Sequence, residues 1–331
     1  MYFGRKQSIL LAAIASLFLV FPGTSLAAGL DLIKFTTTPK TPGANESVTI
    51  RMESFAVNLG SANIIWSIDK EVVHEGIAET SITLRTGEFG VKTVVDIIIE
   101  LAGGGTLSKQ FVLAPAEVDL LWEAQTYTPP FYKGKALPSY KSLVRVTAIP
   151  RFNTLTSDPS EYNYRWTYNR TMGAGEGLGK NSIILPVGYS GSSVPLTVEV
   201  SLPGTEWAGQ KDSKIPVFEP KLVLYEQAPN LGTLFHHPLA QSAPTKGTSF
   251  TIHAVPYFFS SDDLLSGNLI YQWSANQRFE PNGSNPLNLT LVKSGTGAES
   301  KTISLSVQNP KRILQSGRTQ VVVSFTSEKT N

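Results

Sequence analysis

The sequence contains no cysteine among its 331 residues. This absence excludes disulfide bonds, thiol nucleophiles, cysteine-ligated zinc and iron–sulfur clusters. Domains of about 100 residues bury enough apolar surface to fold without disulfide bonds. A chain built from such domains therefore needs no cysteine.

Long apolar runs are scarce as well, and the longest lies at the N-terminus. Residues 1–27 contain two basic side chains, Arg5 and Lys6, then thirteen uncharged residues from Ile9 to Phe21, and then the small residues Ser25 and Ala27 at the −3 and −1 positions of a cleavage site. This is the pattern of a secretion signal, and its apolar run is shorter than the ~20 residues that span a bilayer. We expect cleavage after Ala27 and no membrane span in the mature chain, with an uncleaved anchor as the alternative.

The sequence also lacks an excess of either charge. It has 28 Lys and Arg side chains against 26 Asp and Glu. Removal of residues 1–27 takes away two basic side chains and no acidic one, so the mature chain is neutral. Nucleic-acid binders concentrate basic residues on one face, and we therefore predict no nucleic-acid partner.

What the sequence does have is a tryptophan repeat. Trp66, Trp166 and Trp273 are 100 and 107 residues apart, and each lies on a short alternating run. One buried indole on a central strand is typical of an immunoglobulin-like sandwich. The sequence predicts an all-β fold with three tandem immunoglobulin-like β-sandwich domains after an N-terminal signal helix, and the three tryptophans as structural core.

The predicted domains are residues 28–115, 116–218 and 219–331, called here the first, second and third segments. Their boundaries fall at the proline-bearing joints Ala114–Ala116 and Pro216–Pro220. The second and third segments match best, through Ala148-Ile149-Pro150 and Ala254-Val255-Pro256, with Glu123 and Glu226 as equivalent positions. Proline limits the freedom of both joints.

Alternation with a period of two runs through these segments. Apolar residues alternate with polar ones in four runs: Val144–Ala148, Leu196–Leu202, Ile303–Val307 and Val321–Phe325. This is the pattern of antiparallel sheets that pack on one face. Helical periodicity is absent after the signal, so we expect no further helix.

Catalytic motifs are missing. There is no Gly-x-Ser-x-Gly elbow, and the glycine-rich runs Gly103–Gly105 and Gly173–Gly179 lie between strands, where they predict hairpins or bulges and no phosphate-binding loop. Glu123 and Glu226 lie on separate segments, which argues against a glycosidase pair. We predict a protein that is not an enzyme, with no catalytic residues and no cofactor.

Metal-binding patterns are weak too. His236 and His237 are neighbours on an extended chain and face opposite ways, while His253 lies on the polar side of its strand. The run Ser260–Asp263 offers fewer oxygen ligands than a calcium loop requires. The sequence predicts no metal site.

The runs around the tryptophans carry a family resemblance. Tyr164-Arg165-Trp166 and Tyr271-Gln272-Trp273, together with Gly87–Asp96, resemble strands of the polycystic-kidney-disease/immunoglobulin-like superfamily of bacterial surface proteins. The Phe-Gly-Asp-Gly that usually follows that tryptophan is missing in all three segments. The layout also resembles predicted envelope proteins of ultra-small bacteria. The resemblance implies a role in adhesion, assembly or surface scaffolding.

Aromatic residues in loops are the best candidates for partner contacts. Five are singled out: Tyr127, Phe131, Tyr132, Phe235 and Trp207. Such rings stack on sugars or anchor a protein partner, although they also pack domain joints. We predict an exported, envelope-associated spacer, adhesion or assembly module with a protein or glycan partner at the cell surface. The alternative is a carbohydrate-binding or cell-wall glycan-binding module that uses these rings; the sequence leaves the oligomeric state open.

Overall fold

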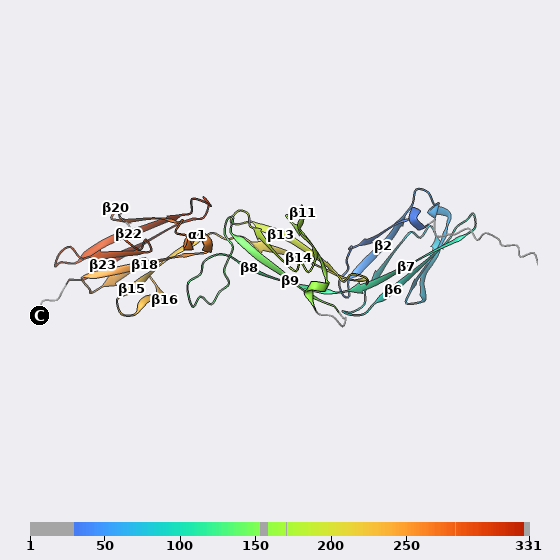
Figure 1. Ribbon diagram of the computed structural model, residues 1–331, viewed down its shortest axis with the longest axis horizontal. Helices are drawn as coiled ribbons and strands as arrows, with labels where there is room; N and C mark the ends of the chain where they lie inside the picture. The colour runs from blue at the N-terminus through green and yellow to red at the C-terminus, as the bar shows by residue number, and fades with distance from the viewer. Residues whose placement is uncertain (1–29, 153–157, 170, 282, 328–331) are drawn as a thin grey trace, which may run out of the picture. The chain divides into compact units, whose positions relative to one another are not determined.

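The computed structural model describes residues 30–152, 158–169, 171–281 and 283–327, without the side chains of residues 171–174. The fold is all-β with tandem immunoglobulin-like sandwiches, as predicted (Figure 1). The predicted signal lies outside the described residues. The described residues divide into two compact units, one within residues 30–36, 50–82 and 95–111, and one within residues 37–49, 83–94 and 112–327.

The third segment forms two sheets around one apolar core. The sheets have the strand orders β16-β15-β18-β21 and β17-β23-β22-β19-β20, and the buried cluster between them includes Leu224, Ile252, Trp273 and Ile303. The strands are β15 (Lys221–Ala228), β16 (Gly232–Pro238), β17 (Ser242–Thr245), β18 (Ser249–Tyr257), β19 (Ile270–Ala275), β20 (Arg278–Glu280), β21 (Asn288–Val292), β22 (Glu299–Gln308) and β23 (Ser316–Phe325).

The second segment repeats this plan. One sheet has the order β12-β9-β8, and the other layer contains β11-β10-β13-β14 in that order. Val146, Trp166 and Val198 are among the buried residues between the two layers. The strands are β8 (Glu117–Ala124), β9 (Leu143–Arg151), β10 (Asn163–Tyr168), β11 (Thr171–Leu178), β12 (Ser182–Pro186), β13 (Ser193–Ser201) and β14 (Trp207–Pro216).

The first segment contributes the sheet β1-β2-β5 and the strands β3, β4, β6 and β7. Burial alternates along β6, where Val95, Ile97 and Ile99 are fully buried, because every second side chain of a strand faces the same side. The strands are β1 (Lys34–Thr38), β2 (Ser47–Glu53), β3 (Asn63–Ile68), β4 (Glu71–Ile77), β5 (Ser81–Arg85), β6 (Thr93–Glu100) and β7 (Thr106–Pro115).

The three predicted core tryptophans are buried on β3, β10 and β19, with at most 1% of each residue exposed. Each indole Nε1 donates a hydrogen bond to a backbone carbonyl further along the chain. The three pairs are Trp66 with Glu79 at 2.9 Å, Trp166 with Lys180 at 2.8 Å, and Trp273 with Pro286 at 2.9 Å. The three segments therefore share the backbone acceptor of the indole N–H as well as the buried tryptophan.

A turn three residues after each tryptophan is repeated too. Asp69, Asn169 and Asn276 have φ values of 49°, 47° and 49°. Such residues tolerate the left-handed region, and two-residue hairpins of type I′ require it. The residues that depart from the family pattern after the tryptophan thus build tight hairpins.

Two sequence predictions are wrong in detail. A short helix, α1 (Ser261–Leu265), interrupts the strands of the third segment, although no helix was expected after the signal. The equivalence of Glu123 and Glu226 is off by one residue. Leu120 and Leu224 occupy the same register, opposite Ala148 and Ala254, and this pairs Glu226 with the position of Trp122.

The first predicted joint lies partly in a strand. Ala114 and Pro115 end β7 and pair in parallel with Trp207 and Ala208 of β14. The backbone N–H of Ala116 then donates to Ala208 at 3.1 Å. Because the strand ladder continues to residue 116, β-pairing fixes this stretch in addition to the proline.

Candidate functional site

The loop between β8 and β9 is attached to the third segment by backbone hydrogen bonds. Tyr127 donates its N–H to Phe259 and accepts from the N–H of Phe258, both at 2.8 Å. The Thr126 side chain donates to Leu137 within the loop at 2.9 Å. The first part of loop residues 127–138 is therefore fixed to residues 258 and 259 of the third segment, and the Thr126 bond ties the start of the loop to its end.

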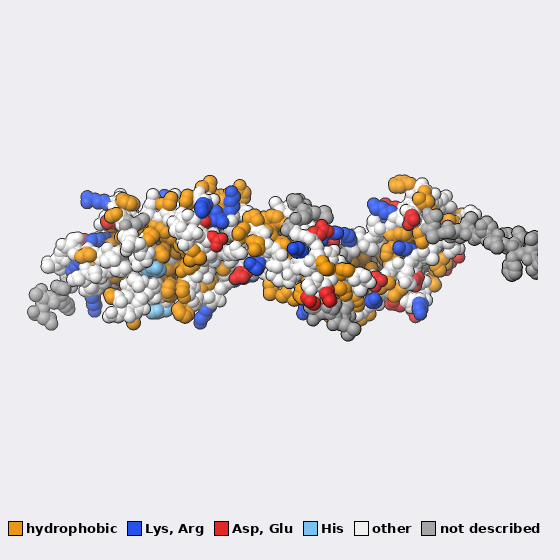
Figure 2. Space-filling model, in the orientation of Figure 1, with side chains coloured by type: hydrophobic (Ala, Val, Ile, Leu, Met, Phe, Trp, Pro, Cys, Tyr) orange, Lys and Arg blue, Asp and Glu red, His pale blue; other side chains and the backbone are white. Residues whose placement is uncertain are grey.

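An aromatic groove of about 530 Å³ lies where this loop meets β16 and β18. The loop contributes Phe131 and Tyr132, β16 contributes Phe235, and β18 contributes Tyr257. The ring of Tyr132 meets that of Tyr257 edge to face at 5.6 Å between centroids. Figure 2 shows histidine side chains among hydrophobic ones on the visible face.

One tyrosine of the groove, Tyr257, keeps its hydroxyl proton. Tyr257 and Tyr225 share a hydrogen bond of 2.7 Å between their hydroxyl oxygens. Burial, and then this bond, raise the pKa of Tyr257 above its ordinary value. Tyr257 is therefore uncharged near neutral pH, and the basic side chains that line the groove are those of Lys133 and His236.

Phe131 projects from the groove into solvent. Its exposed fraction is 91%, and its φ of 66° is unusual for a bulky residue. Pro129 and Pro130 precede it and restrict the backbone of the loop. An aromatic ring held outside the core on a strained, proline-bordered turn is a marker of a functional loop.

The structure brings together three of the five predicted contact residues: Phe131, Tyr132 and Phe235. Tyr127 lies half-buried in the attachment of the loop, where burial raises its pKa. Trp207 is only 7% exposed and lies under Lys92, whose Nζ is 5.7 Å from the ring centroid. The prediction that Trp207 contacts a partner is therefore wrong, because its ring is buried beneath Lys92.

Tyr257 is a groove residue that the sequence analysis missed. It follows the Ala254-Val255-Pro256 run that aligned the second and third segments. That position identifies a strand end. Its proximity to Tyr132 depends on a contact between residues 125 positions apart, which no local pattern records.

The acidic run after β18 has a structural role. The Asp263 carboxylate is 4% exposed, forms an ion pair with Arg312, and accepts a hydrogen bond from Asn309 at 2.8 Å. Within the described ranges, no group of three His, Cys, Asp or Glu side chains lies close enough to hold a metal ion. His253 is instead bonded to Asn288 at 2.6 Å.

Gln315 connects Asn309, which donates to Asp263, to the second segment. Its amide nitrogen donates to Ser139 at 3.0 Å and to the Tyr140 carbonyl at 2.8 Å. Its amide oxygen accepts from Asn309 and from the N–H of Ser260. Gln315 and Ser139 are fully buried, and satisfied buried polar groups of this kind specify one arrangement of the elements that they join.

The glycine-rich runs belong to strands and turns. Gly173–Gly179 runs through β11 and the turn after it, and Gly175 leaves no room for a side chain, because a Cβ there would be 2.8 Å from Ile183. Gly104 and Gly105, with φ of 86° and 101°, connect β6 and β7 as the predicted hairpin. In the described part of the chain, no helix is long and apolar enough to cross a membrane.

Comparison with known proteins identifies no family. No family profile matches the chain, and no curated protein matches it either. Similar solved structures include the three N-terminal domains of the bacteriophage RB49 outer capsid protein Hoc, at 12% identity, covering 90% of this chain and 98% of that one with a TM-score of 0.25. The central fibronectin-III array of RIM-binding protein has 8% identity, coverage of 87% and 95%, and a TM-score of 0.30.

A third similar structure comes from a 1.5-MDa bacterial ice-binding adhesin, at 8% identity, with coverage of 89% and 97% and a TM-score of 0.25. These similarities do not include an envelope protein of ultra-small bacteria. Because the identities and TM-scores are low, they carry no argument about ligand or partner.

Proposed function

We propose that this chain is an exported, non-catalytic adhesion module that binds a protein partner through the aromatic groove. The observation that carries the proposal is the Phe131 ring, 91% exposed beside Tyr132, Phe235 and Tyr257. Exposed apolar patches rimmed by polar residues mark interaction sites. The tandem sandwiches would act as the spacer that carries this groove.

Phe131 has the properties of an anchor residue. Aromatic anchors dominate interface energies when they fill a pocket on the partner. Pro129 and Pro130 restrict the loop before binding, and the loop is attached to Phe258 and Phe259 by backbone hydrogen bonds. Preorganisation of this kind reduces the entropy lost on association.

The groove is less suited to a flat sugar platform. Tyr132 meets Tyr257 at an interplanar angle of 69°, and Phe235 meets Tyr225 at 61°, so the rings offer no shared plane. The carbohydrate alternative also relied on Trp207, which is buried. The geometry at this site therefore favours a protein partner.

A photo-crosslinking experiment tests the proposal. A photoreactive phenylalanine analogue replaces Phe131 in the full chain, expressed on its native cells and irradiated there. The matched control carries the analogue at Phe55, another fully exposed phenylalanine. We expect a discrete protein adduct from position 131 that the control lacks and that Tyr132→Ala weakens. Equal labelling at both positions, or an adduct with sugar alone, would contradict a protein partner at the groove.

A further inference from the structure

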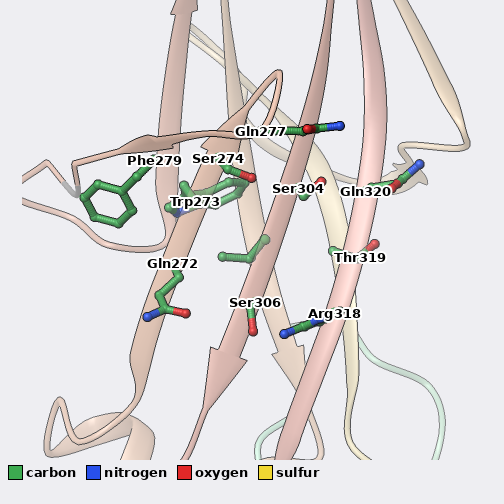
Figure 3. A pocket seen from close by; sticks show the side chains of 11 residues that line it. Gln272, Trp273, Ser274, Gln277, Phe279, Ser304, Ser306, Arg318, Thr319 and Gln320 are labelled. Atoms are coloured by element: carbon green, nitrogen blue, oxygen red, sulfur yellow. The ribbon is translucent and has the colours of Figure 1, made fainter.

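The outer face of the larger sheet in the third segment carries a polar hollow of about 800 Å³. Its side chains lie in rows across the strands. Gln272 of β19 is opposite Ser306 of β22, which is opposite Arg318 of β23. Figure 3 shows these three residues side by side, with Phe279 at the edge of the same face.

A second row runs across four strands. Phe279 of β20 pairs with Ser274, Ser274 with Ser304, and Ser304 with Gln320. Phe279 is 68% exposed, so its ring is available to a ligand at one end of the row. The hollow thus combines amides and hydroxyls with one guanidinium and one exposed ring, and its lining contains no carboxylate.

On the equivalent face of the second segment, the polar side chains bond to one another. Arg165 and Glu199 occupy the positions of Gln272 and Ser306, and they form an ion pair at 3.6 Å. Thr197 donates to Asp212 at 2.6 Å in the next row. The corresponding side chains on the third segment's face are Gln272, Ser306, Ser304 and Gln320. None of them has a hydrogen bond or ion pair with another described side chain.

We propose that this face of the third segment binds a neutral oligosaccharide. Amide and hydroxyl side chains both donate and accept hydrogen bonds, as sugar hydroxyls do. The exposed ring of Phe279 offers an apolar surface for the C–H face of a sugar. One arginine without further basic residues does not provide for a polyanion, which would need several.

A protein occupant fits this face less well. The centres of protein interfaces are apolar and depleted of serine, whereas serines and glutamines occupy the centre of this face and its exposed aromatic ring lies at the edge. The site is separate from the aromatic groove, so either proposal can fail without the other.

Titration calorimetry of the purified full chain tests the site, with cellohexaose, mannohexaose, xylohexaose and chitohexaose as probes. We expect at least one of these neutral sugars to bind, and Phe279→Ala and Gln272→Ala each to weaken that binding about tenfold through lost stacking and hydrogen bonds. Gln210→Ala, on the second segment's equivalent face, and Phe131→Ala, in the groove, are the matched controls and should bind normally. Circular dichroism confirms that each variant is folded.

Three outcomes would overturn the proposal. The first is that none of the four sugars binds, and the second is that Phe279→Ala and Gln272→Ala bind as well as the unchanged chain. The third is a dimer in analytical ultracentrifugation that Phe279→Ala dissociates, because that result would assign the face to a second copy of the chain. Loss of binding in Phe131→Ala instead would move the sugar to the aromatic groove and equally refute this site.

Discussion

The indole Nε1 of Trp273 donates a hydrogen bond to the carbonyl oxygen of Pro286 at 2.9 Å. Trp66 and Trp166 make the same bond to residues 13 and 14 positions further on. Tryptophan is used in sandwich cores for its large apolar area, but its N–H needs a partner once it is buried. In each segment the partner is a carbonyl 13 or 14 residues further on, in the connection between two later strands.

Replacing Trp273 with phenylalanine should therefore destabilise the third segment. The change removes buried apolar contacts and leaves the Pro286 carbonyl unpaired, so we expect the free energy of unfolding to fall by about 3 kcal/mol. Urea denaturation followed by circular dichroism measures the loss. Trp122→Phe is the control, because Trp122 is only partly buried. Equal losses in the two variants would contradict a special role for the bonded indole.

A methyl group at Gly175 should also be costly. A Cβ there would be 2.8 Å from the Ile183 side chain and 3.4 Å from the Trp166 ring. Overpacking of this kind costs about 1–3 kcal/mol. Thermal denaturation of Gly175→Ala against Gly103→Ala measures it, since a Cβ at Gly103 meets nothing within 4 Å. An unchanged melting temperature for Gly175→Ala would show that this packing yields easily.

Neutralising the buried carboxylate of Asp263 should loosen the contact between the second and third segments. Asp263→Asn leaves the Arg312 charge without its partner, and breaking a buried ion pair costs about 3–5 kcal/mol. Arg312 also donates to the Lys141 carbonyl at 2.9 Å. We expect faster hydrogen exchange at Tyr127 and Phe258 in Asp263→Asn and no change in Asp262→Asn, whose side chain is exposed. Slow exchange in both variants would contradict the prediction.

Alkaline pH should act on the second segment through Tyr164. Its buried hydroxyl has no hydrogen-bond partner among the described residues, and burial raises its pKa to about 12. Between pH 10 and 12 the unfolded state loses this proton while the folded state keeps it, so stability falls as pH rises through that window.

Tyr164→Phe should remove this part of the alkaline sensitivity. At neutral pH it should leave stability unchanged or raise it by about 1 kcal/mol, because an unpaired buried hydroxyl is lost. Urea denaturation at pH 7 and pH 11 tests both statements, with Tyr189→Phe, which is exposed, as the control. A clear loss of stability at pH 7 would show that the hydroxyl has a partner.

Much of the fold could be predicted because strand burial is a local pattern. Leu196, Val198 and Val200 alternate in the sequence and are buried on one side of β13, as expected. Short or irregular features were missed. Helix α1 is five residues long, too short for helical periodicity to be visible.

The candidate groove was predictable only in part. Phe131 and Tyr132 stand out because an aromatic pair follows two prolines in a loop. That Phe235 and Tyr257 lie beside them depends on hydrogen bonds between the loop and residues 258 and 259. Such long-range contacts are set by packing, and they leave no periodicity in the sequence.

The sequence by itself determined the all-β class and the three buried tryptophans, because both follow from alternation within a few neighbouring residues. The tertiary structure alone decided which loop rings share a groove and that Trp207 is covered. It also decided that the polar side chains on one face of the third segment make no bonds with other described side chains. These outcomes depend on which distant surfaces meet, and side-chain types along one strand do not encode that choice.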